Sequence, residues 1–280
     1  VNLTGNSTTT GVNTYVGIYL GSGTATPGAA LLTGNDSNLF QNNIIEAVRN
    51  GIYLRGTNTA TQYDSYNRVL NNTIGGTIAP GGSQNTTFFG GVSTVSGIYL
   101  NSQKNAIVDG NTVRNSVQGF YYARGIHLDA LLSTGASNKD VTINANNIYN
   151  LVYNGISGYG NHGIRVQINN NTANNIRITN NFISNIAADG DNVTSSFDYG
   201  IAGIQIPSNA SAANTDAGVF IYHNSINLYD NGTQKLLTRT NLIASCIATQ
   251  TNVAGGVHIK NNILKNTYPA SCSTTSRALA

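Results

Sequence analysis

Two short motifs alternate along the whole chain, and their alternation limits the fold more than any other feature of the sequence. One is a bend asparagine shortly before an aliphatic residue, and it occurs at Asn43, Asn72, Asn111, Asn147, Asn181, Asn224 and Asn262. The other is a glycine that opens a short strand, at Gly17, Gly51, Gly97, Gly125, Gly163 and Gly203, with residues 242–247 taking its place in the last repeat. This one-for-one alternation is typical of a solenoid, in which every coil contributes the same strands and loops absorb differences in length.

Residues 140–168 contain one complete repeat, and the pattern within it indicates strands. The segment that starts at Val141 alternates apolar and polar residues, as a strand with one buried face must. The bend asparagine has a short amide side chain, which tolerates the left-handed backbone region and bonds locally. No 3.6-residue period of helical length fits the segment. The sequence therefore predicts an all-β chain, with asparagines stacked at one corner: Asn72, Asn111, Asn147, Asn181 and Asn262.

Composition supports one ordered domain. The repeat runs through both halves of the 280-residue chain without a break, so we predict a single domain, residues 1–280. Only 9% of the residues are charged and Glu occurs once, which excludes surface helices rich in Glu and Lys. Asparagine occurs 43 times, and such usage suits many bends and stacked amide ladders. The regular spacing of Ile, Val and Leu argues against disorder.

Charge and hydropathy exclude several classes of partner. The net charge is +3 and the basic residues are scattered, so we expect no nucleic-acid partner. No apolar run approaches 18 residues, so we expect no membrane span. His162, His223 and His258 lack metal-ligand spacing, and we expect neither a metal nor a cofactor. The first and last coils lack caps, so we expect a segment of a longer chain whose partners include further coils of that chain.

The repeated motifs resemble the parallel β-helix repeat of the pectin-lyase-like superfamily. Residues 219–229 (VFIYHNSINLY) and 256–264 (GVHIKNNIL) are similar to β-helix regions of large secreted surface proteins of Bacteroidetes that use type IX secretion. The resemblance implies a right-handed parallel β-helix of about seven coils with three short strands per coil, in a secreted or cell-surface protein. It implies less about activity, because the superfamily contains lyases, hydrolases, epimerases, adhesins and inert stalks.

In such a coil the glycine-opened strands place their second and fourth residues inward and their third and fifth outward. The third residues form the column Tyr19, Tyr53, Tyr99, His127, Arg165 and Gln205, and Asp129 is the fifth residue of its strand. Aromatic rings and Arg suit a sugar ring or a uronate carboxylate, and His beside a carboxylate can act as a general base. Alternatively, outward Tyr residues only satisfy strand propensity and pair across strands. The candidate ligand-binding residues are Tyr53, Tyr99, His127, Asp129 and Arg165, and Arg124 is expected near the same face.

Signals of catalysis are weak. The acidic residues are dispersed, and the closest pair, Asp189 and Asp191, lies in a loop where an ordinary polar turn is the simpler interpretation. Cleavage of glycosides generally uses two carboxylates. We therefore predict no catalytic residues and a non-catalytic extracellular module: a stalk, an adhesin or a glycan-binding scaffold, with glycans or surface proteins as partners. The alternative is a lyase or hydrolase that acts on an acidic polysaccharide at the Tyr/His/Arg face.

The two cysteines are expected to form a disulfide. Cys246 and Cys272 are 26 residues apart, which is less than one repeat, so adjacent coils can bring them together. An even pair in an exported protein favours a bond, which would contribute about 3 kcal/mol. Two buried free thiols are the alternative.

Overall fold

The structure is a computed structural model that describes residues 2–4, 7–8, 11–12, 16–21, 34–56, 62–77, 89–91, 94–118, 121–130, 137–153, 159–168, 174–188, 200–207, 218–229, 243–249, 256–268 and 275–279. All regular elements in these ranges are β-strands, so the predicted all-β class is confirmed for the described part of the chain. Three large parallel sheets contain most of the strands. The described residues include no helix that is long and apolar enough to cross a membrane.

The three large sheets are named here in the order in which the chain visits them. Sheet 1 contains β4 (Val16–Leu20), β7 (Asn50–Arg55), β12 (Val95–Asn101), β16 (Ala123–Asp129), β19 (His162–Val166), β22 (Ile201–Ile206), β25 (Ile243–Thr249) and β28 (Thr275–Leu279). Sheet 2 contains β5 (Leu39–Gln41), β9 (Arg68–Leu70), β14 (Ile107–Asp109), β17 (Thr142–Asn144), β20 (Ile176–Thr179), β23 (Val219–Tyr222) and β26 (Val257–Lys260).

Sheet 3 contains β1 (Asn2–Thr4), β6 (Ile44–Glu46), β10 (Thr73–Ile74), β15 (Thr112–Gln118), β18 (Asn147–Tyr153), β21 (Phe182–Ala187), β24 (Ser225–Leu228) and β27 (Ile263–Asn266), with β11 (Phe89–Gly91) beside β15. Two small sheets complete the fold. One pairs β8 (Asp64–Ser65) with β13 (Gln103–Lys104) in parallel, and the other pairs β2 (Ser7–Thr8) with β3 (Gly11–Val12) in antiparallel orientation.

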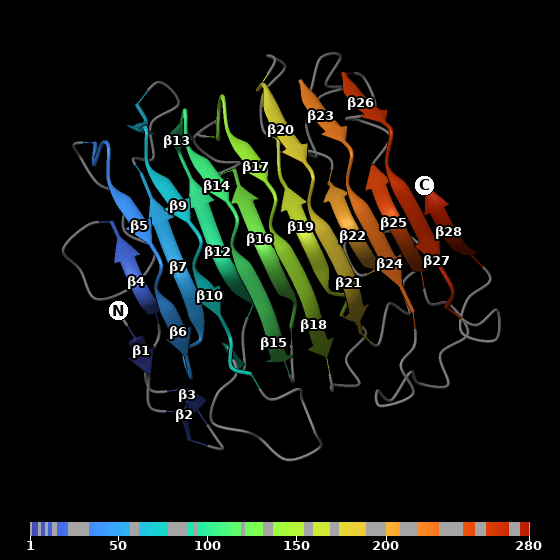
Figure 1. The fold of residues 1–280 in the computed structure, drawn as a ribbon, viewed down its shortest axis with the longest axis horizontal. Helices are drawn as coiled ribbons and strands as arrows, with labels where there is room; N and C mark the ends of the chain where they lie inside the picture. Colours follow the sequence, from blue (N-terminus) through green and yellow to red (C-terminus); the bar gives the residue numbers. More distant parts are fainter. Residues whose placement is uncertain are drawn as a thin grey trace.

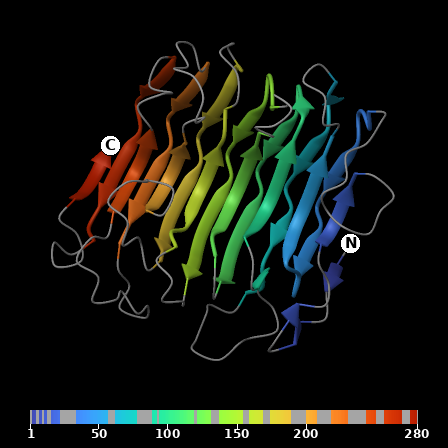
Figure 2. The ribbon, with the colours of Figure 1, turned by 180° about the vertical axis from the view of Figure 1, so that it is seen from behind.

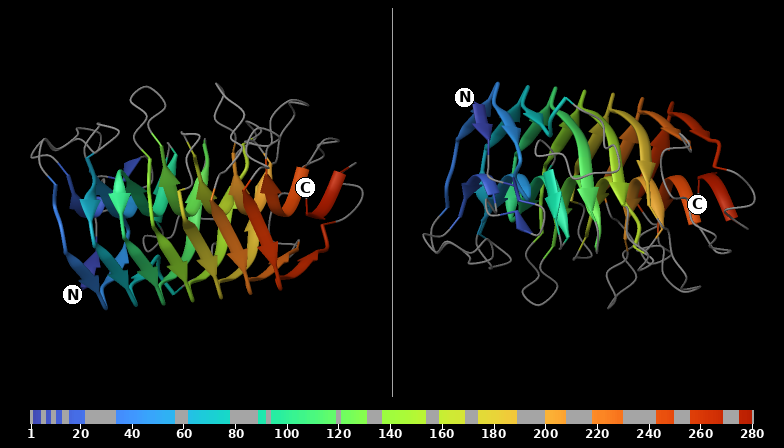
Figure 3. Two further views of the ribbon diagram at one scale, coloured as in Figure 1. Left: turned by 90° about the horizontal axis from the view of Figure 1, so that it is seen from above. Right: turned by 90° about the horizontal axis from the view of Figure 1, so that it is seen from below.

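The chain passes from sheet 1 to sheet 2 to sheet 3 and back to sheet 1, so each strand pairs with the equivalent strand of the next repeat. Successive repeats therefore lie side by side from the N-terminal to the C-terminal end of the molecule (Figures 1 and 2). Views from above and below show the layers of strands facing one another (Figure 3). This arrangement is compatible with a parallel β-helix.

Aliphatic columns fill the space between the sheets. The second residues of the glycine-opened strands are fully buried from the second repeat onward, as predicted: Ile52, Ile98, Ile126, Ile164 and Ile204. Ile18 and Leu20 of β4 are partly buried against the same core. Burying one such side chain is worth roughly 1.5–3 kcal/mol. The columns therefore provide the main drive for stacking one repeat on the next.

A ladder of seven asparagines connects the repeats at the corner between sheets 2 and 3. Each Oδ1 after that of the first member accepts bonds of 2.8–3.0 Å from both the backbone N–H and the Nδ2 of the preceding member. The members are Asn43, Asn72, Asn111, Asn146, Asn181, Asn224 and Asn262. Each ladder amide thus supports the next repeat with two bonds.

Two details of the predicted corner were wrong. Asn146 occupies the ladder position assigned to Asn147, because Asn147 starts β18 and pairs with Thr112 of β15. The left-handed residue is the one before each ladder asparagine, with φ between 52° and 65°. These residues are Asn42, Asn71, Gly110, Ala145, Asn180, His223 and Asn261. The ladder asparagine therefore serves as the amide that bonds between repeats, and its predecessor makes the bend.

The sheet 1 strands from β4 to β22 begin one or two residues before the predicted glycine, and the glycine is needed because the backbone there lies against the interior of the coil. A Cβ on Gly163 would lie 2.6 Å from the carbonyl oxygen of Gly203 and 2.6 Å from Cγ2 of Ile183 in sheet 3. Equivalent contacts occur at Gly51 and Gly125. The glycine is thus required by close packing between sheet 1 and sheet 3, and not by a positive φ.

Candidate functional site

The structure places the predicted outward column in register across sheet 1. Tyr19 pairs with Tyr53, Tyr53 with Tyr99, and Tyr99 with His127. His127 pairs with Arg165, and Arg165 with Gln205. The same register sets Asp129 beside Asn101 on the neighbouring strand. All five candidate ligand-binding residues therefore lie on one face of four adjacent strands, β7, β12, β16 and β19.

Tyrosine rings stack along the N-terminal part of this column. The rings of Tyr53 and Tyr99 are nearly parallel, with centroids 3.9 Å apart and an angle of 7° between their planes. Tyr19 is tilted against Tyr53 at 6.1 Å, and His127 meets Tyr99 edge to face at 5.3 Å. Tyr53 and Tyr99 therefore cover one face of each other's ring, and a sugar ring cannot stack on those two faces.

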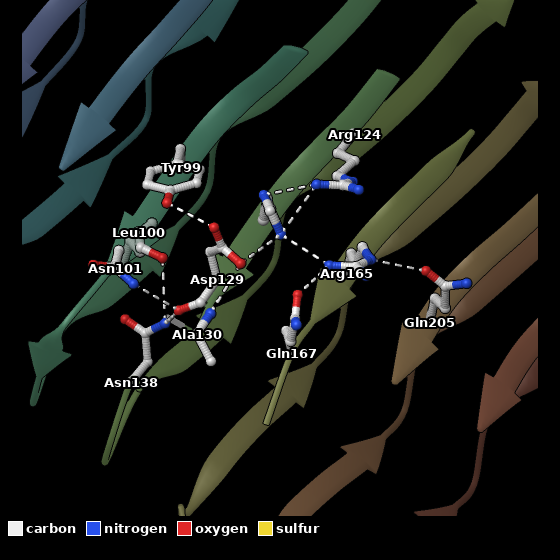
Figure 4. A network of polar contacts seen from close by, with 11 residues as sticks. Tyr99, Leu100, Asn101, Arg124, Asp129, Ala130, Asn138, Arg165, Gln167 and Gln205 are labelled. Carbon is white, nitrogen blue, oxygen red and sulfur yellow. Dashed lines mark hydrogen bonds and ion pairs between the residues drawn. The ribbon is translucent and has the colours of Figure 1, made fainter. Parts of the chain in front are cut away.

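A network of polar contacts continues the column beyond Tyr99 (Figure 4). The hydroxyl of Tyr99 donates to Oδ2 of Asp129 at 2.8 Å, while Oδ1 accepts from the N–H of Ala130 at 3.0 Å. Arg165 donates through Nη1 to Oε1 of Gln167 at 2.8 Å and through Nε to Oε1 of Gln205 at 3.1 Å. The carboxylate and the guanidinium thus have protein partners.

His127 lies at the centre of the network between two arginines. Nη1 of Arg165 is 3.2 Å from its Nε2, and Nη1 of Arg124 is 3.3 Å from both ring nitrogens. A guanidinium only donates hydrogen bonds, so Nε2 has to accept and the imidazole has to be neutral. Burial lowers the pKa of His127 well below 6.5, and the charges of Arg124, Arg165 and His162 lower it further.

Whether His127 forms an ion pair with Asp129 depends on the protonation state of the imidazole. Nε2 of His127 is 3.7 Å from Oδ1 of Asp129, which would be an ion pair only with a protonated ring. Because the pKa of His127 is lowered, this contact is not an ion pair at neutral pH. Tyr99 stays protonated as well, because burial and then the nearby Asp129 charge raise its pKa well above 10. At neutral pH the network therefore contains a neutral His127 and a protonated Tyr99.

The centre of this face of sheet 1 is closed to solvent, although the sequence predicted an outward surface. Tyr99, His127 and Arg165 are 6%, 3% and 7% exposed, and Gln205 is 1% exposed. Asp129, Arg124 and Gln167 are partly exposed, and the side chain of Asp129 is 24% exposed. The arrangement acts as a second, polar core on the far side of sheet 1, and whether it binds a ligand stays a prediction.

An aromatic cluster that the sequence did not predict adjoins the network through Arg124. The ring of Tyr159 lies 5.0 Å from those of both Tyr121 and Tyr122, and the guanidinium of Arg124 lies 5.1 Å from the centre of the Tyr122 ring. Tyr121 and Tyr159 each stand four residues before a strand-opening glycine. This equal offset is the signal that could have predicted the cluster.

The remaining predicted sites are only partly described. Asp189, Asp191 and Cys272 lie outside the described residues. Cys246 is a buried thiol that donates to the carbonyl of Lys265 at 3.3 Å, and burial raises its pKa to about 12. The disulfide stays a prediction. In the described ranges, no three His, Cys, Asp or Glu side chains gather in a way that could hold a metal ion.

Comparison of the chain with models of known protein families, with characterised proteins and with solved structures finds no match.

Proposed function

We propose that this chain is a right-handed parallel β-helix of about seven coils, three short strands per coil, related to the pectin-lyase-like superfamily. It serves as a non-catalytic scaffold within a secreted or cell-surface protein of the Bacteroidetes type that uses type IX secretion. The handedness follows the general preference of parallel crossovers. The seven-membered asparagine ladder supports the coil number, because each coil contributes one member.

The ladder is the observation that carries the scaffold role. It joins every repeat from Asn43 to Asn262 by paired bonds, and side-chain amides along it are buried from Asn72 to Asn224. Buried amides that lose a partner carry the full desolvation cost, so one coil cannot shift alone without unsatisfied groups. Such a stack holds its length and shape, which is what a stalk or an adhesin shaft requires.

The state of His127 supports a scaffold over an enzyme. A general base needs a free ring nitrogen within hydrogen-bond reach of the substrate. In His127, Nε2 is occupied by Arg165, and the side chain is 3% exposed. The only described carboxylate in contact with it, Asp129, already accepts from Tyr99 and Ala130. Polysaccharide cleavage at this face is therefore the less supported function.

An activity screen separates the two functions. The purified chain is incubated with polygalacturonate, alginate and neutral polysaccharides, and new reducing ends and unsaturated ends are measured. We expect no release above that of heat-denatured protein. Release by the wild type that is abolished in His127→Ala or Arg165→Ala would instead establish a carbohydrate-active enzyme.

A distance measurement tests the architecture behind the scaffold. Spin labels are placed on Gln41→Cys and Lys260→Cys in a background where Cys246 and Cys272 are alanine. Both positions are exposed and belong to one register column of sheet 2, six strand spacings apart. At about 4.8 Å per spacing, we expect one narrow distance distribution near 29 Å. A broad distribution would contradict a rigid stack.

A further inference from the structure

The outer face of sheet 2 carries a group of cationic and aromatic side chains near the C-terminal end, on β20, β23 and β26. Arg177 pairs with Phe220 and Phe220 with His258 in one register column. Tyr222 pairs with Lys260 in the neighbouring column. The alternation of buried and exposed residues in the three strands sets all five side chains on the side away from the core. We call these five residues the sheet 2 patch.

Three polar side chains of the sheet 2 patch have no hydrogen-bond or ion-pair partner among the described residues. Arg177, His258 and Lys260 are exposed. Among the described residues, no group accepts a hydrogen bond from their side-chain nitrogens or forms an ion pair with them, and the guanidinium of Arg177 lies over an aromatic ring. Arg165 on sheet 1 differs, because its guanidinium is buried and bonded to Gln167 and Gln205. The charge of the sheet 2 patch is thus available to a partner.

Aromatic stacking holds this charge in place. The guanidinium of Arg177 lies 5.1 Å from the centre of the Phe220 ring. On the neighbouring strand the His258 ring is stacked on Phe220, at 5.0 Å with 7° between the planes. Tyr222 packs edge to face on Phe220 at 6.0 Å. Phe220 therefore orders its neighbours before a partner arrives, which lowers the entropy that binding would cost.

Opposing charge lies outside the strands of the sheet 2 patch. None of β20, β23 and β26 contains an acidic residue. Within the sheet 2 strands the one acidic residue is Asp109 on β14, and its Oδ1 already accepts from Nδ2 of Asn144 at 2.8 Å. Asp140, two residues before β17, accepts from Nδ2 of Asn175 at 2.9 Å, so both carboxylates lie on the Arg177 side of the sheet 2 patch and Lys260 is farthest from them.

We propose that the sheet 2 patch binds an acidic polysaccharide whose charges are carboxylates. Arg177 and Lys260 provide charge-assisted donors for separate carboxylates along one polysaccharide chain, and the hydroxyl of Tyr222 offers a partner for sugar hydroxyls. A single-stranded nucleic acid fits less well, since it needs open aromatic faces for its bases while the Phe220 ring is covered by Arg177 and His258. This site lies on a different sheet from the Tyr/His/Arg face and goes beyond the scaffold role.

Binding of the full chain to polygalacturonate, measured by biolayer interferometry at low salt, tests the proposal. We expect binding that weakens with added salt, and the variant Arg177→Gln/Lys260→Gln should bind about tenfold more weakly or worse. Phe220→Leu keeps every charge but removes the ring that orders Arg177 and His258, so it should bind more weakly than wild type. Thermal unfolding of each variant establishes that the fold is retained.

Arg68→Gln is the matched control. Arg68 is also exposed and lies in the same register column of sheet 2, but its neighbours there are Leu39 and Ile107. Its substitution should leave binding unchanged. An equal loss in Arg68→Gln, no loss in the double variant, no binding by the wild type, or tighter binding to a single-stranded DNA oligonucleotide would each overturn the proposal. None of these outcomes would alter the distance or activity results that test the scaffold.

Discussion

At the scale of single residues, asparagine has two separate tasks in this chain. Buried ladder members such as Asn146 join repeats through Oδ1 and Nδ2. Exposed residues such as Asn180 make the bend before the ladder, with φ of 56°. Asn suits the second task because its short polar side chain lowers the cost of the left-handed region. The high asparagine content thus follows from two needs in every repeat.

Ala145 departs from this rule and offers a stabilising substitution. It is exposed and has φ of 52°, where an L-residue other than Gly, Asn or Asp is strained. We expect Ala145→Asn to raise the free energy of unfolding by about 0.5–1 kcal/mol. Chemical denaturation measures the change. Ala106→Asn is the contrasting variant: Ala106 is buried and lacks a positive φ, so this change should destabilise. A loss of stability in Ala145→Asn would contradict the claim that the backbone at Ala145 is strained.

The buried neutral His127 makes stability depend on pH. Its pKa is lowered in the folded state, first by burial and then by Arg124, Arg165 and His162. The unfolded chain therefore binds a proton near pH 6.5 that the folded chain does not, and stability should fall as the pH decreases below about 6.5. His127→Gln should reduce this fall, because Gln still accepts from Arg165 and does not titrate. Melting temperatures between pH 7 and pH 5 test this, and equal slopes for both proteins would contradict it.

At the scale of elements, the sheet 1 strands from β4 to β22 carry a glycine as their second or third residue, where the backbone closely approaches sheet 3. The glycines let sheet 1 contact the Ile and Val side chains of sheet 3, such as Ile183 against Gly163. Three sheet 3 strands contain a left-handed asparagine instead of a glycine. β15, β18 and β21 bend at Asn115, Asn150 and Asn185, with φ of 49° to 55°. Nδ2 of each of the last two donates to Oδ1 of the one before, which forms a second, shorter amide ladder.

Substitution of a strand-opening glycine tests this packing. Gly163→Ala would bring a methyl group to 2.6 Å from a backbone oxygen and from Ile183, which forces the two sheets apart. We expect a loss of about 1–3 kcal/mol in the free energy of unfolding. Gly200→Ala is the control, since its nearest atom is 3.0 Å away, and it should cost less. Denaturant titration compares them, and a neutral Gly163→Ala would contradict the close approach.

At the scale of the whole molecule, the repeats behave as interchangeable layers. Ladder members Asn111, Asn146 and Asn181 are each 35 residues apart. Strands β15, β18 and β21 keep the same register on their neighbours through this distance. In a stack of this kind each repeat contacts chiefly the repeats on either side. Stability should therefore scale with the number of repeats and not depend on any one of them.

Removal of one layer tests this property. Deletion of residues 147–181 joins Asn146 to Phe182, so β15 can pair with β21 in the register that β18 now uses. We expect the shortened chain to fold with the same circular dichroism spectrum and a lower melting temperature. A deletion of residues 150–181, which breaks the 35-residue spacing, is the control and should fail to fold. Loss of structure in both would contradict independent layers.

Sequence reasoning predicted the layers well, because neighbours in a stack share their position within the repeat. The aliphatic column through Ile52, Ile98 and Ile126 and the register of Tyr53, Tyr99 and His127 follow directly from aligning the glycines. The same logic extends to the sheet 2 patch, since Arg177, Phe220 and His258 each stand four residues before a ladder asparagine. In the adjacent pair Asn146 and Asn147, matching the short motif chose the wrong residue, whereas the even spacing of 35 residues points to Asn146.

Exposure was decided only by the tertiary structure. Arg165 on sheet 1 and Arg177 on sheet 2 both occupy outward positions of alternating strands, yet Arg165 is buried and Arg177 is exposed. Alternation separates the core side of a strand from the opposite side, but it contains no information on what lies over that opposite side. Covering a face depends on contacts between segments far apart in the chain. For that physical reason the pattern located both arginines, while the fold alone determined which of them can meet a partner.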